Sequence, residues 1–226
     1  MEKVVIGLSG GMDSTTLLGF LLEQGCSVHC VSFTYGSKHN KYEQVAVKNI
    51  IEYYLRGGFK VTFSHIDLFE QFYLIKSNLL LSGGDIPEGH YNEPTMKLTV
   101  VPGRNLIISS FLAAIAESTN AQYIALGVHS GDHFIYPDCR PEFINSLQQT
   151  LFYSTEGKVK IITPFTELNK ADILKIGHSL KTMIPYHLTR TCYKDQEISC
   201  GKCGSCVERL EAFSLINKKD PINYEV

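Results

Sequence analysis

The feature that most constrains the fold is a regular alternation of short apolar runs with longer segments whose apolar residues recur at helical spacing. The short runs predict strands at 4–8, 28–34, 61–67, 123–128 and 159–162. The longer segments predict helices at 13–24, 42–53, 105–119, 143–151 and 169–180. Such alternation predicts a parallel sheet with helices on both faces, whose ligands bind beyond the carboxyl ends of the strands.

The length of the chain limits the number of domains. Its 226 residues suffice for one α/β domain with a small appendage, and not for two domains with separate hydrophobic cores. We therefore predict a Rossmann-like, doubly wound domain over residues 1–182. Residues 183–226 are predicted to form a small helical segment that binds a metal and packs on that domain.

Composition argues against several classes of protein. Hydrophobic residues make up 44% of the chain and charged residues 19%, which excludes a disordered chain and a coiled coil. The chain has 21 Lys and Arg residues and 23 Asp and Glu residues, so it lacks the basic excess typical of nucleic-acid-binding proteins. Stable binding to nucleic acid is therefore not expected. The longest apolar run, 106–116, is well short of the ~20 residues that cross a bilayer, and the N-terminal residues lack a signal-peptide pattern. We expect a cytoplasmic protein without a membrane segment.

A loop rich in Gly and Ser lies between the first predicted strand and helix, where α/β sheets bind phosphate. Its glycines let backbone N–H groups approach oxygen closely, and the hydroxyls of Ser9, Ser14 and Thr15 can donate to the same anion. The Gly-Lys-[Ser/Thr] of a Walker A loop is absent, which favours binding of a pyrophosphate and release of AMP. The predicted ATP-binding residues are Leu8, Ser9, Gly10, Gly11, Met12, Asp13, Ser14 and Thr15.

Three charged residues near this loop or at predicted helix starts are candidates for direct action on ATP. Asp13 would repel phosphate unless it holds a cation, so we assign it to Mg²⁺ bound with ATP. Arg104 is expected to neutralise a carboxylate or a phosphate, and Lys170 to offset phosphate charge. The alternatives are a helix-capping Asp13 in an ordinary strand-to-helix turn, and solvated surface side chains for Arg104 and Lys170.

The segment 127–142 is the most polar and least periodic stretch to follow a predicted strand. Asp132 and Asp138 offer carboxylates that accept from ring N–H groups, while Phe134 and Tyr136 offer rings for stacking. We predict a pocket here that binds a flat heterocycle, against the alternative of a polar loop that closes the sheet edge. His129 and His133 are interpreted as hydrogen-bonded loop residues rather than metal ligands. The long irregular stretch of residues 70–104 is expected to act as a lid or substrate loop.

Four of the seven cysteines lie within fifteen positions near the C-terminus: Cys192, Cys200, Cys203 and Cys206. In a reducing compartment such a group predicts a metal site rather than disulfides. Four thiolates with no further ligand candidate nearby favour one structural Zn²⁺ per chain, with an iron–sulfur cluster and a chance grouping as the alternatives. Cys26 and Cys30 are interpreted as small core residues.

Several motifs together carry a resemblance to a known family. Ser9-Gly-Gly-Met-Asp-Ser14 resembles the PP-loop of the N-type ATP pyrophosphatases. The chain as a whole resembles the 7-cyano-7-deazaguanine (preQ0) synthase family of the queuosine pathway. This resemblance rests on motifs in the same order, at 101–105, 127–133, 136–143, 169–172 and the cysteine group. It implies a Rossmann-like fold of the adenine nucleotide alpha hydrolase type with a bound Zn²⁺.

The resemblance also implies an activity, namely ATP-driven conversion of 7-carboxy-7-deazaguanine and ammonia into the nitrile. The residues expected to act directly are Asp13, Arg104 and Lys170, with Arg104, Asp132, Tyr136 and Asp138 binding the substrate. The chain has no space for a glutaminase domain, so the expected partners are ATP, ammonia and the deazaguanine acid. A homodimer is left open.

Other functions compatible with these motifs are kept as alternatives. A phage or phage-defence paralogue could stop at the amide, or could attach a deazaguanine to a protein or nucleic acid. A PP-loop enzyme that modifies tRNA would need a basic surface, whereas residues 183–226 balance six Lys and Arg with six Asp and Glu. A zinc module without catalytic activity would have no use for the Gly-rich loop.

Overall fold

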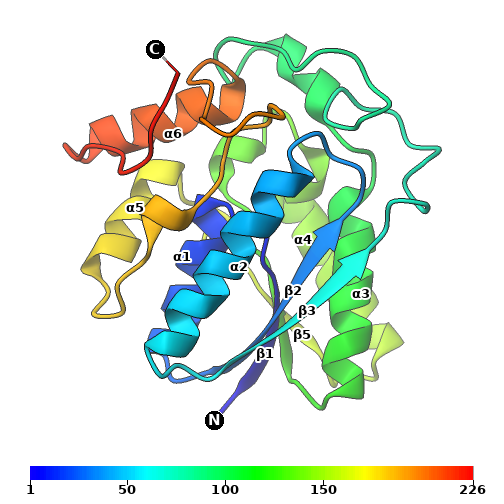
Figure 1. The fold of residues 1–226 in the computed structure, drawn as a ribbon. Coiled ribbons are helices and arrows are strands. Elements are labelled where there is room, and N and C mark those ends of the chain that lie inside the picture. The colour runs from blue at the N-terminus through cyan, green and yellow to red at the C-terminus, as the bar shows by residue number, and fades with distance from the viewer. Residues whose placement is uncertain (226) are drawn as a thin grey trace.

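The predicted strands form one parallel sheet in the order β3-β2-β1-β4-β5, which confirms the predicted fold class (Figure 1). The computed structural model describes residues 1–225. The strands are β1 Lys3–Gly7, β2 Ser27–Thr34, β3 Val61–Asp67, β4 Tyr123–Ala125 and β5 Lys160–Ile162. β4 is shorter than predicted because its ladder with β5 ends at the Ala125–Ile162 pair.

Six α-helices and four short 3₁₀ helices connect and follow the strands in the described residues. The α-helices are α1 Met12–Glu23, α2 Asn40–Arg56, α3 Arg104–Ser118, α4 Pro141–Ser154, α5 Lys170–Ser179 and α6 Gly204–Leu215. The 3₁₀ helices are η1 Pro94–Thr99, η2 Ser130–Asp132, η3 Pro137–Cys139 and η4 Tyr186–Leu188. None of the helices within residues 1–225 is both long and apolar enough to cross a membrane.

Successive residues of β1 are buried against helices on opposite faces of the sheet. Val4 and Ile6 belong to a core with α1, α2 and Ile173 of α5. Val5 belongs to a second core with residues of α3 and α4. Because both of its faces are covered, β1 is a continuous apolar run rather than an alternating one. Cys26 and Cys30 are buried in the first of these cores, as predicted.

The position of β1 fixes where a ligand binds. From β1 the chain winds outward through β2 and β3, and then returns to place β4 on the other side of β1. The loops that follow β1 and β4 therefore diverge at a switch point, the usual ligand crevice of such sheets. These loops lie close together, because a Cβ added at Gly127 would lie 3.3 Å from the carbonyl carbon of Asp13.

Two segments cover the end of the sheet at which the strands terminate (Figure 1). The long segment after β3 contributes apolar residues, Leu79 and Val101 among them, to a core that includes the four C-terminal cysteines. It therefore packs over the cysteine group, and its predicted action as a lid or substrate loop stays a prediction. The C-terminal segment packs on the main domain through Ala212 and Phe213 of α6, which share a core with Met12. The boundary at residue 182 stays a prediction.

Candidate active site and metal centre

The loop between β1 and α1 is shaped by a glycine that no other residue can replace without strain. Gly10 has a φ of +79°, and a Cβ there would lie 3.0 Å from both Ala46 Cβ and Glu43 O. Gly11 is the N-cap of α1, so the unpaired N–H groups of the first helical turn lie at the end of the loop. A helix N-terminus of this kind attracts phosphate.

The three hydroxyls of the loop differ in their availability to a ligand. Ser9 Oγ and Ser14 Oγ lie 3.0 Å apart, and both residues line the cavity described below. Thr15 is fully buried and donates to Gly11 O at 2.7 Å. Its hydroxyl stabilises the start of the helix, and ATP binding by Thr15 stays a prediction.

A cavity of about 240 Å³ occupies the switch point. The loop residues Leu8, Ser9, Gly11, Met12, Asp13 and Ser14 line it. So do three residues predicted from distant parts of the sequence, Arg104, Asp132 and Lys170. Gly10, Thr15, Tyr136 and Asp138 are not among its lining residues. The fold thus brings most of the predicted site into one small-molecule cavity.

Five charged or titratable side chains meet at the floor of this cavity. Lys170 Nζ lies 2.6 Å from Glu208 Oε2 and 3.5 Å from Asp13 Oδ2. His129 Nε2 lies 3.6 Å from Asp13 Oδ2 and 3.4 Å from Asp132 Oδ2. Burial disfavours the ammonium of Lys170, but the carboxylates of Asp13 and Glu208 outweigh it and raise the pKa of Lys170 above its ordinary value. Three carboxylates thus surround one permanent cation, and the group favours a further cation.

One oxygen of this group fits a metal ion. Asp13 Oδ1 is buried and hydrogen-bonds to no residue within 1–225. A buried polar atom without a partner is rare and commonly marks a site for a water or an ion. Carboxylate oxygens are the ligands that Mg²⁺ prefers, so Asp13 fits the cation that accompanies ATP.

Arg104 is the first residue of α3, and its guanidinium lines the cavity. Gly103 precedes the helix with a φ of +69°, and the Arg104 guanidinium donates to the Tyr35 hydroxyl at 3.4 Å. The carboxylate of Asp138 accepts the backbone N–H of Asn105 at 3.0 Å. Asp138 therefore stabilises the start of α3 beside Arg104, and direct contact of Asp138 with substrate stays a prediction.

The residues predicted to form the heterocycle pocket do not all line one cavity. Asp132 lines the cavity, whereas Phe134 is 54% exposed on the surface. The Tyr136 hydroxyl lies 2.8 Å from Thr99 Oγ1 and 3.3 Å from the Tyr193 hydroxyl. Tyr136 lines a smaller neighbouring hollow rather than the main cavity. Among the predicted ring-binding residues, Asp132 is the one placed against the main cavity.

Several polar residues that the sequence analysis did not select also line the cavity: His39, Glu43, Arg190, Tyr193, Ser205 and Glu208. His39 Nε2 lies 3.2 Å from Glu43 Oε1, and its ring lies 5.4 Å from the ring of Tyr193. His39 and Glu43 follow β2, so the rule that ligands lie at strand carboxyl ends would have found them. The others belong to the C-terminal segment, whose return over the cavity has no signal in the sequence.

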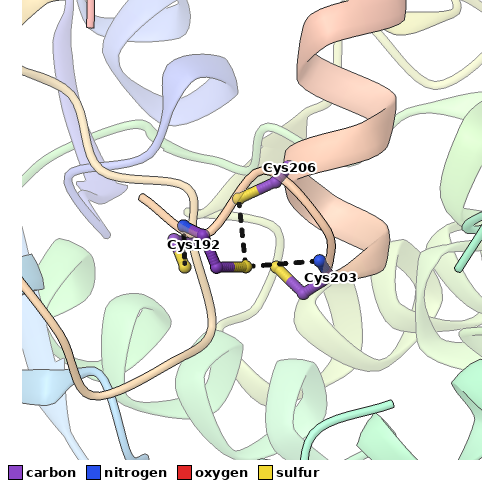
Figure 2. A group of neighbouring side chains, drawn as sticks. Cys192, Cys203 and Cys206 are labelled. Carbon is purple, nitrogen blue, oxygen red and sulfur yellow. Dashed lines mark hydrogen bonds between the residues drawn. The ribbon is translucent and has the colours of Figure 1, made fainter. Parts of the chain in front are cut away.

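The four C-terminal cysteines form a closed cluster. All are buried, and their sulfur atoms lie within 4.8 Å of one another. Figure 2 shows Cys192, Cys203 and Cys206 turned toward one another beside the start of α6. A hydrogen bond from the Cys203 thiol and the N–H groups of Lys202 and Cys203 lower the pKa of Cys200 to about 6. All seven cysteines are free thiols, so this donor set suits a metal ion, as predicted.

A fully buried arginine connects the cavity wall to the C-terminus. The guanidinium of Arg209 donates to both carboxylate oxygens of Asp220, at 2.7 and 2.9 Å. It also donates to the hydroxyls of Thr189 and Thr191, at 2.7 and 3.0 Å. Thr191 lines the cavity, so this network holds one of its walls in place.

The Gly-rich loop, the switch-point cavity and the lysine–carboxylate group define a nucleotide-binding α/β protein of the PP-loop class. A solved structure with this fold, NMN synthetase from Francisella tularensis, aligns with a TM-score of 0.51 at 15% identity. The alignment covers 96% of this chain and 78% of that one. At this identity the likeness concerns the fold alone.

The chain belongs to the QueC family, since the model described as queuosine biosynthesis protein QueC matches residues 3–217. The 7-cyano-7-deazaguanine synthase of Pseudoalteromonas atlantica is 44% identical over 227 residues, which covers 100% of both chains. The protein of the same name from Caldicellulosiruptor saccharolyticus is 43% identical and covers 99% of this chain and 96% of that one. These findings confirm the resemblance drawn from the motifs.

Proposed function

We propose that this chain is an ATP-dependent 7-cyano-7-deazaguanine synthase, which converts 7-carboxy-7-deazaguanine and ammonia into the nitrile preQ0. One observation carries the proposal: the PP-loop, Asp13 and Lys170 meet in a single cavity of a chain similar over its whole length to proteins of this name. We place the reaction in the cytoplasm, where the free thiols of the chain stay reduced.

The first chemical step is activation of a poor electrophile. The substrate carboxylate attacks the α-phosphorus of ATP, the bond to the bridging oxygen breaks, and pyrophosphate leaves. The N–H groups at the start of α1 stabilise the departing pyrophosphate, and Lys170 offsets its charge. Arg104, which also lines the cavity, neutralises the reacting carboxylate or the α-phosphate. Asp13 would hold the Mg²⁺ that accompanies ATP, and the ion would supply further charge neutralisation.

The later steps exchange oxygen for nitrogen. Ammonia attacks the acyl carbon of the adenylate, AMP leaves, and a proton is lost as the primary amide forms. A second ATP then adenylates the amide oxygen with release of a second pyrophosphate. Loss of this oxygen with AMP and of the two amide protons leaves the nitrile, so each nitrile requires two ATP.

We propose that the cysteine cluster holds one Zn²⁺ with a structural role. Four buried thiols fill the coordination sphere, so no position remains open for water or substrate. Arg190, Tyr193 and Ser205 lie within three positions of Cys192 or Cys206 and line the cavity. The metal therefore positions one wall of the active site while taking no part in the chemistry.

The nucleotide products test the class of reaction. Because the loop lacks the lysine that contacts a γ-phosphate in Walker A proteins, we expect AMP and pyrophosphate as the products. Chromatography of the nucleotides after turnover with the deazaguanine acid and ammonium measures this. Detection of ADP and phosphate in their place would rule out attack at the α-phosphate.

A pair of matched substitutions tests which carboxylate binds the deazaguanine ring. Asp132→Asn removes an acceptor from the cavity, and we expect the KM for the deazaguanine acid to rise about tenfold or more, because ring N–H donors lose their partner. Asp138→Asn keeps an oxygen that accepts the Asn105 N–H, and we expect that KM to change little. The KM for ATP should stay constant in both, and an unchanged KM in Asp132→Asn would place the ring elsewhere.

A further inference from the structure

A second, smaller hollow adjoins the active-site cavity. Its volume is about 20 Å³, which admits one molecule the size of water, since a single water requires about 10–15 Å³. Tyr91, Met96 and Ile135 contribute to its wall. Four further residues line both the hollow and the main cavity: Asp132, Tyr193, Ser205 and Glu208. The two spaces therefore meet at these residues.

A buried carboxylate lies at this junction. Glu208 projects from α6, and the residue is only 8% exposed. Its Oε2 contacts Lys170 Nζ at 2.6 Å, whereas Oε1 accepts no hydrogen bond from any described residue. Oε1 approaches the backbone so closely that a Cβ added at Gly131 would lie 2.5 Å from it. Gly131 thus leaves room for this oxygen, which remains available to a ligand.

We propose that this hollow is the subsite through which ammonium enters and is bound, with Glu208 as its carboxylate. The inference rests on the proposed function, because that reaction consumes ammonia as well as two much larger substrates. Ammonium resembles water in size, carries a positive charge at neutral pH, and offers four N–H donors. Glu208 Oε1 and the hydroxyls of Ser205 and Tyr193 are acceptors for these donors. Asp132 adds negative charge at the same place.

The position of the subsite suits the chemistry that follows. Ammonium must lose one proton to become the nucleophile ammonia, and a second proton leaves as the C–N bond forms and the C–O bond to AMP breaks. Both protons pass to solvent, and Glu208 serves to bind the ammonium. The main cavity meanwhile remains filled by nucleotide and deazaguanine. A narrow separate route also excludes larger amines.

Substitution of Glu208 tests the carboxylate. Glu208→Gln keeps the side-chain volume and an acceptor for Lys170, and we expect the KM for ammonium chloride to rise about tenfold or more. Carboxylate-dependent exchange of pyrophosphate into ATP, measured without ammonium, should fall far less than turnover at subsaturating ammonium, because adenylation precedes the use of ammonia. Glu211→Gln is the matched control, since Glu211 lies on the same helix, pairs with His90 at 3.2 Å and lines neither space.

Widening the hollow tests the route without touching its carboxylates. Tyr91 lines the small hollow and not the main cavity, so Tyr91→Ala should admit methylamine. We expect the parent enzyme to prefer ammonium over methylamine by about a hundredfold, and the variant to lose roughly tenfold or more of this preference. The product with methylamine is the N-methylamide, which mass spectrometry identifies. Zinc content and melting temperature check that each variant is folded.

The outcomes separate this inference from the proposed function. An unchanged KM for ammonium in Glu208→Gln would overturn the subsite, as would pyrophosphate exchange that falls as much as turnover. Equal use of methylamine and ammonium by the parent enzyme, or an unchanged preference in Tyr91→Ala, would also overturn it. Absence of any exchange with 7-carboxy-7-deazaguanine in the parent enzyme would instead refute the proposed function.

Discussion

Replacement of Cys203 with serine is expected to reduce the zinc content from one ion per chain to a small fraction and to lower the melting temperature. Structural zinc sites contribute on the order of 10–16 kcal/mol to the folding of their segments, and serine is a poor ligand for Zn²⁺. Residues 190–208 should lose order with the metal. Activity should fall with it, because Tyr193, Ser205 and Glu208 line the cavity from this segment. Metal analysis and thermal unfolding measure the two effects.

Cys26→Ser is the matched control for this change. Cys26 is buried in the core on one face of the sheet, away from the cluster, and burial raises the pKa of its thiol. We expect Cys26→Ser to retain one Zn²⁺ per chain and most of its activity. Full zinc occupancy in Cys203→Ser would mean that the metal is bound elsewhere, and loss of zinc in both variants would mean that it responds to general instability.

Replacement of Asp13 with asparagine is expected to lower turnover about a hundredfold to a thousandfold while the fold persists, as is typical when one electrostatic contact to the reacting groups is removed. The substitution keeps the shape of the side chain and removes its charge. It leaves Lys170 with Glu208 as its remaining close carboxylate and removes the candidate oxygen for Mg²⁺. Steady-state rates over a range of Mg²⁺ concentrations measure the effect.

Asp172→Asn provides the comparison for Asp13. Asp172 lies in the first turn of α5, pairs with Lys175 at 2.9 Å and does not line the cavity. We expect near-parental turnover from Asp172→Asn and unchanged zinc content in both variants. A near-parental rate from Asp13→Asn would reduce Asp13 to a residue that stabilises the start of α1.

The parts of this molecule that could be predicted are those marked by a pattern within a short stretch of sequence. Val4 to Ile6 form a continuous apolar run because both faces of β1 are covered, and the Gly-rich loop directly follows that strand. Cys200 and Cys203 are close in sequence, so the sequence alone was enough to predict that both contribute to a metal site. Arg104 and Lys170 were found because each begins a helix at the end of the sheet where ligands bind.

The parts that were missed depend on contacts between distant segments. Glu208 lies between charged and apolar residues of α6, and nothing in the local sequence marks it as a site residue. Its carboxylate enters the site because α6 packs where Glu208 contacts Lys170. Asp138 is predicted to bind the ring, and only the folded structure shows that its carboxylate also accepts the N–H of Asn105 at the start of α3; ring binding by Asp138 stays a prediction. Sequence alone does not distinguish these roles, because both need a carboxylate after a strand.

The identity of the product is the most direct test of the proposed activity. Purified protein should be incubated with 7-carboxy-7-deazaguanine, ATP, Mg²⁺ and ammonium, and the products identified by mass spectrometry. We predict 7-cyano-7-deazaguanine, with two AMP and two pyrophosphate formed for each nitrile. A reaction that ends at the primary amide, or that transfers the deazaguanine to a protein or nucleic acid, would contradict the assignment as a nitrile-forming synthase.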